Sequence, residues 1–152
     1  MTHAIARLRN NMRCNRMFDA LIGYAWKLEY GIDRGWHLHI LFLFDGQKVW
    51  HDEHLSSLIG QYWNQVITQG MGQFYSCNLD KQKYRYEGIG MVDYSDVDKV
   101  SNLKRAASYL TKVDEHTQSF VDASGKAIRS FGMSQYQPKN VNAGRPRMYY
   151  EF

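Results

Sequence analysis

Three side chains around a predicted β-hairpin have the types and spacing of metal ligands. His37 and His39 are two residues apart in an apolar run, and side chains two apart on a strand point to the same face. Gly31 and Gly35 bracket a short loop, which predicts a hairpin. If these glycines face each other, Glu29 lies opposite His37 on that same face. One carboxylate and two imidazoles then converge on one point, as binding of a divalent ion requires.

The alternative is that both histidines are half-exposed surface residues, because the chain contains six histidines. The residues that alternate with them are all apolar, namely Trp36, Leu38, Ile40, Phe42 and Phe44. Such a strand packs one face on a core. Burying three polar groups beside it without a partner would cost on the order of 1–3 kcal/mol each, which favours the metal site.

A second candidate group lies on a helix predicted over residues 96–115. The apolar stripe of this helix consists of Val100, Leu103, Ala106, Ala107, Leu110 and Val113. Tyr109 and Lys112 share a face, and Tyr109 lies at the edge of the stripe, where a core tyrosine is not expected. A lysine three residues after a tyrosine is weak evidence by itself, since Tyr24 and Lys27 have the same spacing. Those two residues belong to the hairpin, where the same spacing points side chains to opposite faces.

Length and composition predict one globular domain over residues 1–152, with a loosely ordered tail after about residue 137. The chain is 44% hydrophobic and 22% charged, which is ordinary for a protein that buries a core. No apolar run reaches the ~18 residues of a membrane span, and no signal peptide is recognisable. Cys14 and Cys77 match no metal or redox spacing. We therefore expect a soluble cytoplasmic protein that does not bind membranes.

Charge and aromatic content favour a nucleic-acid partner. The net charge is +4 and 14% of the residues are aromatic. A helix predicted over residues 4–18 has a basic side, and residues 73–86 interleave cations with tyrosines, which suits stacked bases and phosphates of a single strand. Both segments also suit ordinary exposed surface. The candidate DNA-binding residues are Arg9, Arg13, Arg16, Lys81, Lys83, Arg85 and Arg105.

The remaining patterns predict an α+β fold. Helical spacing covers residues 51–68, alternation predicts a strand in residues 87–94, and a terminal strand is expected through residues 127–131. Together with the hairpin, these segments predict a central antiparallel sheet of four or five strands with helices packed on it.

The order of these elements resembles the HUH endonucleases, which include rolling-circle replication initiators, relaxases and related transposases. In that pattern an apolar residue, here Leu38, separates the two histidines. More narrowly, two stretches resemble the replication-initiation family of filamentous phages (inoviruses) and bacterial prophages. They are KLEYGIDRGWHLHILFLFDG and NLKRAASYLTK. The resemblance runs from about residue 18 to residue 131. It implies an RRM-like sheet, metal ligation by Glu29, His37 and His39, and a nucleophilic Tyr109 with Lys112 beside it.

Two features depart from that pattern. HUH Rep domains usually begin with a strand that carries a first motif, whereas this sequence begins at the helix of residues 4–18. Either that strand is absent from this sequence, or the C-terminal segment takes its place. No second tyrosine follows Tyr109 by one helical turn, which indicates the single-tyrosine branch.

The resemblance implies metal-dependent nicking and joining of single-stranded DNA. Tyr109 would attack the scissile phosphate and form a 5′-phosphotyrosine, and Lys112 would stabilise the developing charge. Mn²⁺ or Mg²⁺ suits a site that also binds a phosphate oxygen. The expected role is initiation of rolling-circle replication of a phage, prophage or plasmid in a bacterial host. A host helicase and polymerase are expected partners, because no GxxxxGK[ST] motif is present.

Other functions remain open at this point. A transposase or a mobilisation relaxase would use the same chemistry for another purpose. A non-catalytic DNA-binding protein could retain the scaffold alone. A structural metalloprotein would need a fourth ligand, and His51 and His54 are better placed as surface residues at the start of a helix.

Overall fold

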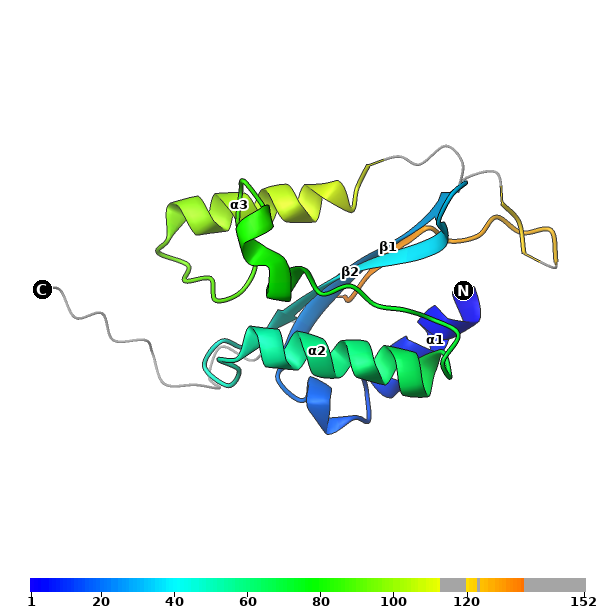
Figure 1. The fold of residues 1–152 in the computed structure, drawn as a ribbon, viewed down its shortest axis with the longest axis horizontal. Helices are drawn as coiled ribbons and strands as arrows, with labels where there is room; N and C mark the ends of the chain where they lie inside the picture. The colour runs from blue at the N-terminus through cyan, green and yellow to red at the C-terminus, as the bar shows by residue number, and fades with distance from the viewer. Residues whose placement is uncertain (113–119, 123, 136–152) are drawn as a thin grey trace, which may run out of the picture.

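The structure, a computed structural model, describes residues 1–112, 120–122 and 124–135. The tail predicted to be loosely ordered after about residue 137 lies outside these residues. The main elements are α1 (Thr2–Asn11), β1 (Leu21–Gly31), β2 (Gly35–Phe44), α2 (Asp52–Tyr62), α3 (Val97–Tyr109) and β3 (Phe131–Met133). The described chain is an α+β protein built on a long hairpin, with α1 and α2 on one side of it and α3 on the other (Figure 1).

The hairpin of β1 and β2 organises the molecule. Its strands pair antiparallel in regular register from Gly23 opposite Leu43 to Gly31 opposite Gly35, so the facing glycines expected from the sequence are confirmed. Because side chains alternate along a strand, one face of the hairpin carries nearly all the large apolar residues. The other face carries the charged residues and the two histidines.

The apolar face packs against α1 and α2. Trp26 and Leu28 of β1 form a buried cluster with Ile5 of α1. A second cluster joins Leu8 and Phe18 to Ile67, which follows α2 in the helical turn η2 (Trp63–Ile67). Figure 1 shows α3 on the opposite side of the hairpin from α1 and α2. The face with the histidines is therefore free of the main core.

The sheet has three strands in the described part of the chain, in the order β2-β1-β3, so the prediction of four or five strands in an RRM-like arrangement is wrong. β3 pairs antiparallel with the middle of β1, from Ala25 opposite Met133 to Lys27 opposite Phe131. It lies slightly later in the chain than the expected strand at residues 127–131. The C-terminal segment thus supplies the strand beside β1.

Residues 87–94, expected to form a strand, pair with no other strand. Gly88 lies against the backbone of α3, where an added Cβ would come within 2.3 Å of Asn102. Gly90 has a φ of +86°, a left-handed conformation that interrupts an extended strand. Residues 87–94 therefore cross α3 as an irregular segment that packs closely on the helix and forms no strand of the sheet.

Two helices, α1 and α3, are shorter than their periodicity predicts, whereas α2 and η2 together cover residues 52–67 of the predicted 51–68. α1 ends at Asn11, and a separate turn, η1 (Arg16–Phe18), completes the segment expected as one helix over residues 4–18. α3 ends at Tyr109, so Lys112 lies in the turn that follows it. No helix in the described ranges is long and apolar enough to cross a membrane.

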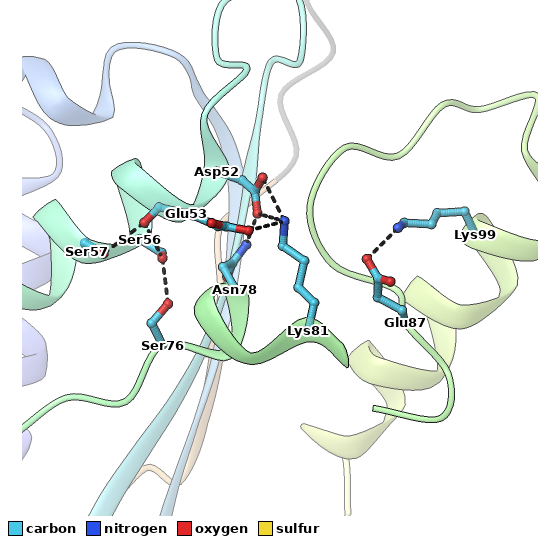
Figure 2. A network of polar contacts seen from close by, with 9 residues as sticks. All are labelled: Asp52, Glu53, Ser56, Ser57, Ser76, Asn78, Lys81, Glu87 and Lys99. Atoms are coloured by element: carbon cyan, nitrogen blue, oxygen red, sulfur yellow. Dashed lines mark hydrogen bonds and ion pairs between the residues drawn. The ribbon is translucent and has the colours of Figure 1, made fainter. Parts of the chain in front are cut away.

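A polar network joins α2 to the turn η3 (Cys77–Lys83), as Figure 2 shows. Asp52 accepts hydrogen bonds from Asn78 at 2.7 Å and from Lys81 at 3.1 Å, and Lys81 also lies 3.2 Å from Glu53. Burial raises the pKa of Asp52, but the bonds from Asn78 and Lys81 outweigh this and lower the pKa overall. The network anchors the segment that leads to α3, because Gly90 passes next to Lys81.

Candidate functional site

The hairpin register places four polar side chains on the face opposite the core. Glu29 is paired with His37, as the sequence predicts, and Lys27 is paired with His39. Paired residues of antiparallel strands project to the same side, so all four side chains share one face. The convergence of one carboxylate and two imidazoles is confirmed.

One carboxylate oxygen is the centre of this cluster. Glu29 Oε2 lies 2.9 Å from His39 Nε2 and 3.8 Å from His37 Nε2. One ligand atom from each residue lies within 4.8 Å of the other two. The Glu29 side chain is 16% exposed and both histidines are just over a third exposed, so solvent reaches the cluster from one side.

A hydrogen bond to the backbone fixes the tautomer of His37. His37 Nδ1 lies 2.9 Å from the carbonyl oxygen of Gly35. A carbonyl can only accept, so Nδ1 carries the proton and Nε2 of the neutral ring carries a lone pair directed at the cluster. This is the tautomer of a metal ligand whose other nitrogen is held by the backbone.

These residues fit a divalent ion. Two ligands of one ion lie at most about 4.4 Å apart, twice a bond length of ~2.2 Å. The distances around Glu29 Oε2 meet this limit, and the whole cluster needs at most a small side-chain rotation. Two imidazoles and one carboxylate suit Mn²⁺ and, with water or phosphate oxygens in the remaining positions, Mg²⁺.

Lys27 is a member of the site that the sequence analysis did not identify. Its side chain is only 4% exposed, and Nζ donates to Glu29 Oε1 at 2.6 Å. Burial raises the pKa of Glu29, but the hydrogen bond from Lys27 and the proximity of His39 outweigh it, so the pKa is lowered. The alternation that linked His37 to His39 also links Lys27 to Glu29, and it was the available signal.

Tyr109 reaches the cluster from the C-terminal end of α3. Its ring lies edge-on to His39 with centroids 5.3 Å apart, so the expected position over the histidine face is confirmed. The hydroxyl lies 3.5 Å from Glu29 Oε2, a long hydrogen bond. Lys27 Nζ and Lys112 Nζ lie 5.6 Å and 5.0 Å from the ring centroid. Burial and the charge of Glu29 raise the Tyr109 pKa, and Lys27 partly opposes them.

The candidate DNA-binding residues fall into separate groups. Arg9 belongs to α1, which packs on the apolar face, and it contacts Tyr24 there. Arg13 and Arg16 follow α1 in the chain as exposed residues. The structure therefore places the α1 arginine on the side of the sheet away from the histidines.

The other candidates lie between α2 and α3. The charge of Lys81 is already matched by Asp52 and Glu53. Lys83 lies over the ring of Tyr75, and its Nζ is 4.0 Å from Asp80. Two further candidates, Arg85 and Arg105, flank one exposed ring, that of Tyr86, at 5.4 Å and 4.4 Å.

Of these, Arg105 is nearest to the site along the chain. It precedes Tyr109 by one helical turn on α3. Its guanidinium has no carboxylate partner within salt-bridge distance in the part of the chain that the structure describes. Among these candidates, Arg105 therefore lies closest to Tyr109 along the chain and has a guanidinium without a carboxylate partner in the described ranges.

Comparisons with known proteins place the chain in one family. No curated protein and no solved structure matches it. Residues 2–134 match the family model of the YagK/YfjJ C-terminal domain, and this match includes the hairpin, α3 and β3. The chain belongs to the YagK/YfjJ C-terminal domain family.

Proposed function

We propose that this chain is a metal-dependent enzyme that nicks and rejoins single-stranded DNA through Tyr109. Its biological role would be the initiation of rolling-circle replication of a phage, prophage or plasmid. The observation that supports the proposal is the hydroxyl of Tyr109, 3.5 Å from the carboxylate that groups His37 and His39. A tyrosine hydroxyl and a cluster of one carboxylate and two imidazoles, from distant parts of the chain, meet on one face of the hairpin.

Glu29, His37 and His39 would hold Mn²⁺ or Mg²⁺. A divalent ion bound there supplies a Lewis acid that polarises a phosphodiester oxygen. The remaining steps belong to the chain's own residues. The oxygen of Tyr109 forms a bond to phosphorus and gives up its proton, while the bond from phosphorus to the 3′ oxygen breaks and that oxygen takes a proton.

The products are a 5′-phosphotyrosine and a free 3′-hydroxyl, which can prime synthesis by a host polymerase. Attack of a 3′-hydroxyl on the phosphotyrosine reverses the reaction and joins DNA. Lys112 lies beside the Tyr109 ring and would stabilise the charge that develops on the phosphate. Tyr109 is 41% exposed, which would allow a strand to approach it from solvent.

One observation favours a second candidate, a non-catalytic DNA-binding protein. Glu29 already accepts hydrogen bonds from Lys27 and His39, so the cluster is satisfied as an ion-pair network. A protein that uses the hairpin only as scaffold would show this same arrangement. Adduct formation separates the two candidates.

The test is incubation with a random single-stranded DNA pool and Mn²⁺, followed by a denaturing gel and mass spectrometry of the protein. We expect a covalent adduct on Tyr109, and none in Tyr109→Phe, which removes one oxygen and keeps the ring. Tyr24→Phe is the matched control, because Tyr24 has the same spacing to a lysine but points to the apolar face. Lys112→Ala should slow adduct formation by about 10²–10³-fold.

Two results would contradict the assignment. An adduct on Tyr24, or full cleavage by Tyr109→Phe, would exclude Tyr109 as the nucleophile. DNA binding without an adduct in Mn²⁺ or Mg²⁺ would support the non-catalytic candidate.

A further inference from the structure

Lys27 is the one buried charged side chain in the described parts of the chain. A lysine rarely remains buried unless a partner offsets the loss of hydration. Glu29 is its only carboxylate partner among the residues that the structure describes. Ala25 and Phe131 lie next to Lys27 on the same face of the sheet, so an apolar residue would fit at position 27. A buried charge at this position therefore lowers the stability of the fold.

The two oxygens of Glu29 have different partners. Lys27 contacts Oε1, whereas His37, His39 and the hydroxyl of Tyr109 are grouped around Oε2. An ion bound with the two histidines would consequently meet a single carboxylate oxygen. Lys27 both orients the carboxylate and keeps its second oxygen from the ion.

The charges of the cluster sum to zero before an ion binds. Glu29 contributes one negative charge and Lys27 one positive charge, and an imidazole that binds an ion does so in its uncharged form. A divalent ion would add two positive charges that no side chain of the cluster offsets. Because Lys27 is buried and close to Glu29, solvent screens its repulsion of the ion only weakly.

A DNA substrate carries the missing negative charges. Each phosphodiester of the strand that lies at the site brings one. We propose that Lys27 couples the two ligands: its buried charge weakens metal binding in the free protein, and a bound DNA phosphate restores it. This inference rests on the proposed function, and it adds that the metal and the DNA bind cooperatively.

The test measures Mn²⁺ binding, with no cleavage involved. Free Mn²⁺ is measured by electron paramagnetic resonance, with and without an excess of random single-stranded 20-mer, and corrected for binding to the DNA alone. All proteins carry Tyr109→Phe so that the DNA stays intact. With Lys27 present, the DNA should raise Mn²⁺ affinity at least about fivefold.

Removing the charge should remove this coupling. Lys27→Met has nearly the same length without charge, and we expect it to bind Mn²⁺ about tenfold tighter without DNA and to gain little from DNA. Lys27→Arg keeps the charge and should behave like the parent. Lys48→Met, which removes an exposed cation whose only ion pair among the described residues is with Asp45, is the control and should change neither value.

Lys27→Gln serves as a second neutral variant, and circular dichroism reports folding of each protein. Unchanged or weaker Mn²⁺ binding by the folded neutral variants would overturn the coupling while leaving the metal site intact. Tight binding by Lys27→Arg without DNA would also overturn it. If the parent binds no Mn²⁺ with or without DNA, the proposed function and the coupling both fail.

Discussion

The two halves of the candidate site are held in very different ways. Glu29, His37 and His39 belong to a regular antiparallel pair, and Leu28, which precedes Glu29 in β1, is fully buried on the other face. Tyr109 belongs to α3, a helix with no buried residue in its span. Glu29, His37 and His39 are thus fixed by the core on the far side of their strands, whereas Tyr109 is the exposed last residue of α3 and is followed directly by the buried Leu110.

Two of the contacts made by α3 are polar and lie near the surface. Lys99 pairs with Glu87 at 2.9 Å, with 23% and 42% of the side chains exposed, and Arg105 lies on Tyr86. Partly exposed ion pairs contribute about 0–1 kcal/mol each, so none of these contacts holds the helix strongly. α3 can therefore move relative to the hairpin at a lower free-energy cost than any strand of the hairpin. Such movement would let a DNA strand enter beside Tyr109.

The largest expected effect concerns the ligand half. His39→Ala should reduce Mn²⁺ affinity at least about a hundredfold, because it removes one of three ligands from a site with no spare protein donor in the described residues. Lys99→Ala, which loosens α3 only, should leave Mn²⁺ affinity within about twofold. Calorimetric titration of both variants measures the contrast. Equal losses would mean that α3 helps to build the metal site.

A second prediction compares the stability of the two regions. Leu28→Ala should lower the free energy of unfolding by about 3–4 kcal/mol, because it opens a cavity at a fully buried position. Leu103→Ala on α3 should cost about 1–2 kcal/mol, since that side chain is only half-buried. Urea denaturation gives both values. Similar losses would show that α3 is part of the same core as the hairpin.

The smallest expected effect is the loss of stability at low pH that comes from protonation of Asp52. The pKa of Asp52 is lowered below its ordinary value of 3.8, so its ionised form stabilises the folded state. That contribution is complete above about pH 4 and is lost as the pH falls through the lowered pKa. Because the side chain is 30% exposed, solvent screening limits it to under about 1 kcal/mol.

Asp52 anchors the segment that leads to α3, so the effect should be local. Hydrogen exchange at about pH 3 should show faster exchange in η3 and α3 than at pH 6, after correction for intrinsic rates, with little change in β1 and β2. Asp52→Asn should remove the difference between the two pH values. Uniform loosening of all elements would contradict the division into two regions.

The grouping of Glu29, His37 and His39 was predictable because it depends on local geometry. Alternation along a strand and a pair of facing glycines decide which side chains share a face, so residues ten positions apart could be placed from the sequence. The same alternation held the signal for Lys27. A lysine in that position is expected to reach solvent, and only the packing of Tyr109 and β3 around it shows that it is buried.

Long-range packing decided the rest. The strand count was wrong because the glycines of residues 87–94 permit either extended pairing or a close crossing of α3, and periodicity does not distinguish these. Lys81, a candidate DNA-binding residue, is instead paired with Asp52, and this pair forms because the turn η3 meets a helix that begins 29 residues earlier. Tyr109 and Glu29 are 80 residues apart, and their contact depends on how α3 lies on the hairpin. Local sequence specifies each element, but the free energy that places one element on another comes from contacts that exist only in the folded chain.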